Sequence, residues 1–258
     1  MKTTSMINIQ EYLPEICVPV SEDKFAIKYG GTQFGSYREL GDGRSVNYYA
    51  DDKLLTIKGY GKTPLTQPGL DGKLNHKAAM TELAYCDLLS YQRVPTQVVV
   101  ANDNTEDNWQ LTLNRATVLR IGSFEYAARH SSDLVSKMWH YLMLTQNKVD
   151  SKDFFREIVK GYKDLVDQWD SINFVHGCLN TDNMSALPTG IDYSYSGICT
   201  YDDMKSKGRA EFDIHGRYSF YNQIHAVLYG LKKYREALVT ADILADYSLK
   251  DMIVDFNT

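Results

Sequence analysis

Residues 175–197 read VHGCLNTDNMSALPTGIDYSYSG, a polar and irregular stretch that follows neither the helical nor the strand period. It separates two stretches of helical periodicity, one over residues 152–172 and one that begins near Gly216. The apolar face of the first comprises Phe155, Ile158, Val159, Tyr162, Leu165, Val166 and Trp169, and that of the second Phe220, Ile224, Val227, Leu228, Leu231 and Leu238. We therefore expect a long polar loop between two packed helices.

The first half of the chain has the short apolar runs that are typical of strands around one helix. Residues 74–93 predict the helix, and extended runs are predicted at 45–50, 53–58, 96–101, 109–114 and 116–121. Glycines and prolines fall between these runs, in YGGTQFG (29–35), GDGR (41–44) and residues 59–72, so we expect loops there.

A strand-rich half followed by a helix-rich half predicts an α+β protein with two lobes and a cleft between them. We place the N-lobe, which is rich in strands, at residues 1–126 and the helical C-lobe at residues 127–258. Ligands favour such clefts.

Composition limits the classes of partner. The chain has 258 residues, a net charge of −5 and 24% charged residues, so we expect neither nucleic acid nor a membrane as a partner. Its four cysteines form no CxxC pair, and the first residues lack the apolar segment of a signal peptide. We therefore expect a cytoplasmic protein.

The loop over residues 175–197 carries oxygen-bearing side chains at Asp182, Asn183 and Asp192. Mg²⁺ prefers oxygen ligands and usually takes only one or two from the protein, which suits Asn183 and Asp192. Asn and Asp are also common in plain turns, so this cluster has a structural explanation as well.

Two charged residues earlier in the chain bear on the interpretation of this cluster. Lys58 ends the run KLLTIK and Glu82 lies in the next helix, and a strand lysine held by a helix glutamate grips phosphate in protein kinases. Each residue alone would be an ordinary solvated charge. In the order Lys, Glu, Asp-Asn, Asp they follow the kinase order.

Two other features are set aside. GYGKT (59–63) resembles the end of a Walker A loop, but Thr56 stands where that motif needs glycine. His140 and His176 have no partner at ligand spacing, and we expect His176 to hold its loop.

Several blocks of the chain resemble, in order, those of the SelO (YdiU) family of pseudokinases. The blocks are FAIKYGGTQFGSYRELGDGR, IKGYGKTP, LRIGSFE, HGCLNTDNMS, IDY and GRYSFYNQ, and they span residues from about 25 to about 240. The family's patterns are YGGHQFG, LGDGRA, LKGxGxTP, RFGxFE, HGVMNTDNMS, IDYGPFGF and GRYxxxNQ.

The resemblance implies a bilobal kinase-like fold and a protein adenylyltransferase. Such an enzyme binds ATP flipped relative to kinases and transfers AMP to Ser, Thr or Tyr hydroxyls of proteins. Matched by position, the implied roles are catalysis by Asp182, binding of Mg²⁺ or Mn²⁺ by Asn183 and Asp192, and nucleotide binding by Lys58, Glu82, Arg44, Arg120, Asp71, Arg115, Gly41 and Gly43.

The chain departs from the family pattern in four places. The loop before Asp71 is one residue longer and lacks several basic residues, and we expect Lys73 or Lys77 to substitute for them. Arg115 matches its family arginine only approximately, since NRATVLRIG is two residues shorter. IDYSYSGIC replaces IDYGPFGF. The chain also lacks the C-terminal redox motif of typical members, so we expect no redox control through a C-terminal thiol.

The residues leave other functions open. The same site could transfer UMP, because nothing in the sequence reads the base. The chain could also be a catalytically silent nucleotide-binding module that acts through its interactions. An ordinary phosphotransferase ranks last, since YGGTQFG lacks GxGxxG spacing. We expect a monomer whose partners are proteins with reactive hydroxyls.

Overall fold

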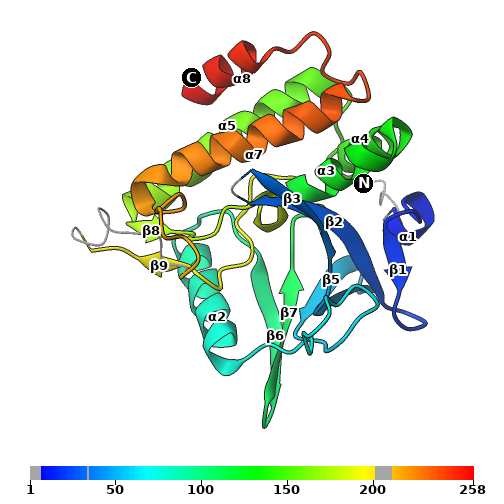
Figure 1. Ribbon diagram of the computed structural model, residues 1–258, viewed down its shortest axis with the longest axis vertical. Helices are drawn as coiled ribbons and strands as arrows, with labels where there is room; N and C mark the ends of the chain where they lie inside the picture. The colour runs from blue at the N-terminus through cyan, green and yellow to red at the C-terminus, as the bar shows by residue number, and fades with distance from the viewer. Residues whose placement is uncertain (1–6, 34, 201–210) are drawn as a thin grey trace.

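The computed structural model describes residues 7–33, 35–200 and 211–258, and it places a seven-stranded sheet beside a group of helices (Figure 1). The sheet has the order β1-β2-β4-β5-β7-β6, with β3 paired to β2. Its strands are β1 (Cys17–Pro19), β2 (Phe25–Gln33), β3 (Ser36–Gly41), β4 (Ser45–Ala50), β5 (Lys53–Lys58), β6 (Val98–Thr105) and β7 (Asn108–Asn114). Neighbouring strands are antiparallel.

Most helices lie in the second half of the chain, above the sheet in Figure 1. The helices are α1 (Ile9–Tyr12), α2 (His76–Tyr91), α3 (Ile121–His130), α4 (Ser132–Thr145), α5 (Ser151–Ser171), η1 (Thr181–Asn183), η2 (Phe220–Asn222), α7 (Gln223–Val239) and α8 (Leu249–Asn257). Among the described residues, no helix has the length and apolarity that crossing a bilayer requires. The expectation of a strand-rich first half and a helical second half is confirmed.

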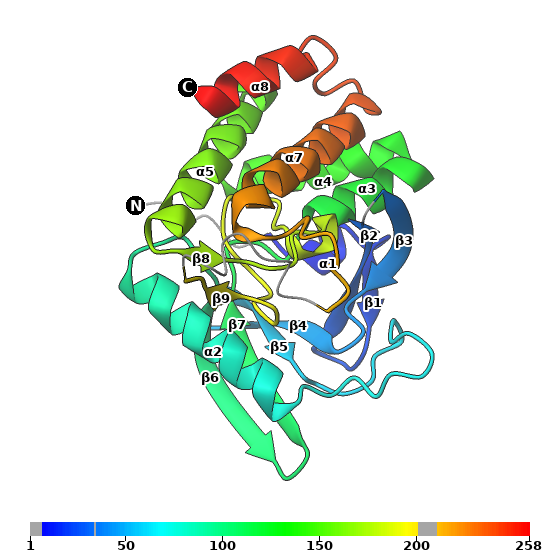
Figure 2. The same ribbon diagram turned by 60° about the vertical axis from the view of Figure 1, so that its left-hand side comes forward.

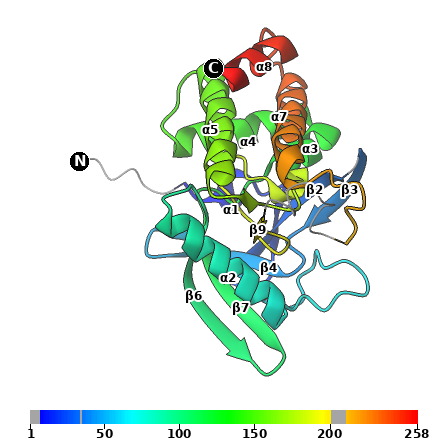
Figure 3. The same ribbon diagram turned by 90° about the vertical axis from the view of Figure 1, so that its left-hand side faces the viewer.

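Helix α2, in the first half of the chain, packs on the sheet. Figures 2 and 3 show it lying across β6 and β7. Its N-cap is Asn75, whose side chain accepts a hydrogen bond from the backbone N–H of Ala78. This packing brings Glu82, which is fully buried, beside the end of β5.

Three expected boundaries were wrong. Residues 29–33 belong to β2 rather than to a loop. Residues 116–121 form no strand, since Arg120 makes an isolated bridge to Ser185 and Ile121 begins α3. The second long helix begins at Gln223 rather than near Gly216. The glycines of β2 serve close packing: a Cβ on Gly30 would lie 2.4 Å from the ring of Tyr37. The expected lobe boundary, 126/127, lies inside α3.

The expected apolar face of α5 is buried along its whole length. Its last turn supports the loop over residues 175–197, since Trp169 contacts both Phe174 and His176. The short strands β8 (Phe174–Val175) and β9 (Gly197–Ile198) pair at the two ends of that loop. The loop is therefore closed at its base and anchored on the helical core.

Helix α3 and strand β2 approach more closely than side chains would permit. A Cβ on Gly122 would lie 1.9 Å from the carbonyl oxygen of Gly30, which is backbone and has little freedom to move. Only glycine fits here. This contact holds β2 against the helical half of the molecule.

We predict that Gly122→Ala lowers the free energy of unfolding by about 2 kcal/mol or more, because the overlap outweighs the gain in helix propensity. Gly230→Ala, in α7, is the matched control, since its new Cβ would meet the flexible end of Met184. Urea unfolding measures both. A loss in Gly122→Ala no larger than in Gly230→Ala would contradict the close packing of α3 on β2.

Candidate active site

A cleft of about 330 Å³ opens between the loops of the sheet and the loop over residues 175–197. Nine of the eleven residues singled out from the sequence line it: Gly41, Gly43, Arg44, Lys58, Asp71, Arg120, Asp182, Asn183 and Asp192. The other two, Glu82 and Arg115, are not part of the lining. Their hydrogen bonds place them behind it.

Lys58 links the sheet, α2 and the polar loop. Its Nζ donates to Glu82 Oε2 at 2.6 Å and to Asp192 Oδ1 at 2.7 Å. The Lys58 side chain is 3% exposed and that of Glu82 is fully buried. Two carboxylates offset the cost of burying this ammonium group.

Two arginines join the same carboxylate. Arg115 Nη2 lies 3.3 Å from Asp192 Oδ1, and Arg120 Nη1 donates to Asp192 Oδ2. Gln97 ties Arg115 to the Lys58–Glu82 pair, because its Oε1 accepts from Arg115 at 2.9 Å and its Nε2 donates to Glu82 at 2.5 Å. Three cationic side chains, from three segments of the chain, therefore contact Asp192.

The surroundings of Asp192 hold it ionised. Burial alone would raise the pKa of its carboxyl, but Arg120, Lys58 and Arg115 lower that pKa well below its usual range. Its backbone has a φ of +61°, in the left-handed region, where a residue with a Cβ is strained. As expected, His176 supports this turn, since its Nε2 lies 2.7 Å from the carbonyl oxygen of Ile191.

Asp182 lies under strand β2. A Cβ on Gly31 would come within 2.4 Å of Asp182 Oδ1, so the carboxylate lies directly against the backbone of the strand. Burial raises the pKa of the Asp182 carboxyl to about 6, and the positive charge of Arg120 limits that rise. Arg120 also donates to the backbone carbonyl of Asp182 at 2.5 Å.

A buried carboxylate on α3 fixes the approach of β2 to η1. Glu125 accepts from the Thr32 hydroxyl at 2.6 Å and from the Thr181 hydroxyl. Thr181 Oγ1 in turn accepts from the backbone N–H of Thr32 at 2.8 Å. These bonds hold the residue before Asp182 on the strand that covers it.

The donor set at Asn183 and Asp192 fits a divalent cation that keeps further ligands from elsewhere. Asn183 Nδ2 donates to the carbonyl oxygen and to Sγ of Cys178, both at 3.2 Å, which leaves its Oδ1 as the ligand atom. The described residues contain no group of three or more His, Cys, Asp or Glu side chains that could hold a metal alone. Two oxygen ligands with phosphate and water as the others are usual for Mg²⁺.

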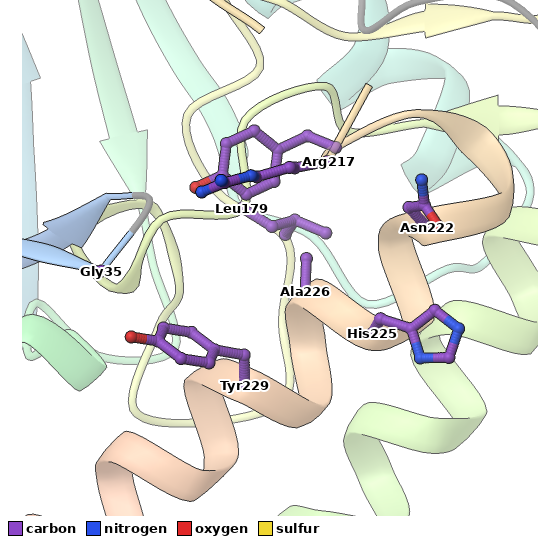
Figure 4. A pocket seen from close by; sticks show the side chains of 8 residues that line it. Gly35, Leu179, Arg217, Asn222, His225, Ala226 and Tyr229 are labelled. Atoms are coloured by element: carbon purple, nitrogen blue, oxygen red, sulfur yellow. The ribbon is translucent and has the colours of Figure 1, made fainter. Parts of the chain in front are cut away.

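A second pocket, also of about 330 Å³, adjoins the same polar loop (Figure 4). It is lined by Gly35, Leu179, Arg217, Tyr218, Asn222, His225, Ala226 and Tyr229. None of these residues is acidic, so this pocket has no carboxylate for a metal. Tyr218 donates to Asn180 and so connects the pocket to the segment that carries Asp182.

The matching family model, Protein adenylyltransferase SelO, covers residues 17–258. The chain belongs to the SelO family. It is similar to the protein nucleotidyltransferases YdiU of Clostridium botulinum strain Okra (29% identity, 88% of this chain and 49% of the relative), Shouchella clausii (29%, 86% and 50%) and Shewanella denitrificans (30%, 83% and 47%). This SelO chain spans about half the length of the curated relatives it matches.

Sequence reasoning missed four residues of the site in this SelO chain. Gly72 and Asp42 line the cleft, while Glu125 and Gln97 support it from behind. Asp42 lies within GDGR, a motif already quoted, and Gly72 directly follows Asp71, so both could have been singled out there. Glu125 is the last residue of LRIGSFE, which was also quoted, whereas Gln97 has no such signal, because its role depends on tertiary contacts.

We predict that Asp182→Asn stabilises the protein more at pH 8 than at pH 4.5. An acid whose folded pKa lies above its unfolded value, 3.8, binds more protons when folded, so its stability cost grows as pH rises from about 4 to about 6 and then stays constant. The gain over wild type should be about 2 kcal/mol larger at pH 8 than at pH 4.5.

Urea unfolding at the two pH values measures this difference. Asp164→Asn, on the exposed face of α5, is the control and should show no such trend. An equal effect of Asp182→Asn at both pH values would contradict a buried carboxyl with a raised pKa.

Proposed function

We propose that this SelO family chain is a protein adenylyltransferase that transfers AMP from ATP to Ser, Thr or Tyr hydroxyls. The observation that carries this proposal is the convergence of Lys58, Arg120, Asp182, Asn183 and Asp192 on one cleft. The names of the family and of the curated relatives support nucleotidyl transfer to protein.

The buried end of the cleft favours phosphate over base. Lys58 and Arg120 are almost fully buried there, and their ammonium and guanidinium groups suit anionic oxygens. A base would need apolar faces instead. We therefore place the triphosphate at this end, in the flipped orientation, with the base toward the opening.

A wider groove supports this placement. It runs between α2 and the loop after Asp192, and it shares Arg44, Ser194 and Tyr195 with the cleft. The groove has room for the nucleoside. Its lining also includes Lys77, one of the two lysines expected to replace the missing basic residues, while the other, Lys73, lines the cleft and pairs with Asp107.

The lobes resemble a protein kinase in the roles of their residues. A lysine at the end of a strand pairs with a helix glutamate, and an Asp-Asn pair and a later Asp follow on a polar loop. We infer a kinase-like arrangement, with residues 1–126 as the phosphate-binding lobe and residues 127–258 as the lobe that binds metal.

The chemistry needs one bond formed and one broken. The acceptor hydroxyl oxygen attacks the α-phosphorus, the bond from that phosphorus to the bridging oxygen breaks, and pyrophosphate leaves. Asp182 receives the hydroxyl proton; with a pKa of about 6 it is mostly ionised at neutral pH and still basic enough to accept it. A bound Mg²⁺ or Mn²⁺ would supply neutralisation of phosphate charge.

Lys58 and Arg120 would hold the transferred and leaving phosphate oxygens as negative charge shifts onto pyrophosphate. Glu82 holds Lys58, and the backbone carbonyl of Asp182 holds Arg120, through bonds that do not involve the metal ligand Asp192, so both cations stay at the cleft when nucleotide and metal bind. Asn183 and Asp192 would orient the cation, and η1 keeps Asn183 next to Asp182.

Labelled ATP tests this proposal. We predict that protein incubated with Mn²⁺ acquires label from ATP labelled at the α-phosphate and none from ATP labelled at the γ-phosphate. Asp192→Ala should lower the labelling rate by about 100-fold or more, because it removes a ligand of the cation. Asp246→Asn, an exposed aspartate paired with Lys152, is the control and should label normally.

The alternatives give different results. Label from the γ-phosphate alone would mean a kinase. Labelling from UTP at a higher rate than from ATP would favour UMP transfer, and nucleotide binding without any label would favour a silent binding module. Full labelling of Asp192→Ala would refute the metal assignment.

A further inference from the structure

Asp42 is a carboxylate in a cleft whose other buried charges suit an anion. It lines the cleft between Gly41 and Gly43, and it is 6% exposed. A carboxylate facing a triphosphate would repel it at close range. Its presence there needs a positive partner or a bonding role.

One oxygen of Asp42 is fixed to the sheet. Oδ2 accepts from the backbone N–H of Ile27 at 3.1 Å and from Asn47 Nδ2 at 2.8 Å. Asn47 is itself held by Thr56, whose hydroxyl donates to its Oδ1 at 2.7 Å. Burial raises the pKa of the Asp42 carboxyl, and Arg120 and this amide oppose the rise.

The other oxygen faces an arginine. Asp42 Oδ1 lies 3.9 Å from Arg120 Nη2, on a guanidinium whose Nη1 is bonded to Asp192 and to the carbonyl of Asp182. The same guanidinium lies over the ring of Tyr29, 4.7 Å from its centroid. Arg120 is thus placed between two carboxylates, one on the sheet and one on the polar loop.

These two carboxylates differ in what else they can bind. Asp192 is a candidate cation ligand, and a cation that takes its oxygens weakens its hold on Arg120. Asp42 is tied to backbone and to Asn47, so it stays in place. Without Asp42, the guanidinium would keep only the backbone carbonyl of Asp182 as an anchor, and it would lose part of its orientation and part of its affinity for phosphate.

We propose that Asp42 is a positioning residue that holds Arg120 toward the nucleotide when metal occupies Asp192. This inference rests on the proposed function. Asp42 keeps Nη2 on the sheet side, so the Nη1 hydrogen that Asp192 releases is available to a phosphate oxygen while the other stays on the carbonyl of Asp182. It acts through Arg120 and touches no reacting atom.

A double-mutant cycle on nucleotide affinity tests this role. The probe is α,β-methylene ATP with Mn²⁺, measured by calorimetry. We expect Asp42→Asn to weaken binding about 10-fold, because an uncharged amide no longer anchors the guanidinium. In an Arg120→Lys background the same change should cost less than about twofold, since the group it positions is gone.

Asp213→Asn is the matched control. Asp213 is also buried and accepts two backbone N–H groups, from Arg217 and Tyr218, both at 2.8 Å, but it does not line the cleft. The Asp213→Asn substitution should leave nucleotide affinity within about twofold of that of the wild type. A purely structural role for Asp42 would instead give equal losses with Arg120 and with Lys at position 120.

Each outcome of these binding measurements either supports or overturns the role of Asp42. Wild-type affinity in Asp42→Asn, or an equal loss in both backgrounds, overturns this inference and leaves the proposed function standing. No binding by the wild type overturns the proposed function and this inference together. If Asp42→Asn does not fold, Asn47→Ser replaces it, because it removes one of the two hydrogen bonds to Oδ2 and keeps the charge. About threefold weaker binding supports the role and unchanged binding overturns it.

Discussion

The carboxylate of Asp192 is the point on which the site depends. It binds Lys58 from the end of β5, Arg115 from the segment after β7 and Arg120 from the residue before α3. All three cations are nearly buried, so each would be destabilising without a negative partner. The sheet and the polar loop are therefore joined by charge as well as by packing.

This arrangement links folding to ligand binding. Three cations and the carboxylate of Asp192 leave two formal positive charges, which Glu82 and Asp42 offset, so an anionic ligand would bind here together with a metal cation. Bound nucleotide and metal would replace contacts within the protein. Phosphate would bind the cationic side chains, and the metal ion would bind Asp192. The two should bind cooperatively, because each releases partners that the other needs.

The second consequence concerns Asp182. The close approach of Gly31 buries its carboxyl and raises the pKa, while Glu125, Thr32 and Thr181 fix the approach itself. The basicity of the proposed proton acceptor is thus set by backbone packing. A side chain at Gly31 would change both the geometry and the charge state.

Much of this could be predicted from the sequence, for physical reasons. The helical period of α5 and the strands KLLTIK and SVNYYA have clear patterns, and nine of the candidate residues do line one cleft. Strand β2 was missed because its glycines were read as turn formers, although they permit close contact with Tyr37 and Asp182. Asp42 and Glu125 lie in the quoted motifs GDGR and LRIGSFE, but their roles were missed because those roles depend on tertiary partners, Arg120 for Asp42 and Thr32 and Thr181 for Glu125.

A crystal structure with α,β-methylene ATP and Mn²⁺ tests the proposed site most directly. We expect the triphosphate at Lys58 and Arg120, Mn²⁺ on Asn183 and Asp192, the α-phosphorus facing Asp182 and the base toward the opening of the cleft. A base enclosed beside Lys58 with the γ-phosphate at Asp182, or a nucleotide bound outside the cleft, would contradict it.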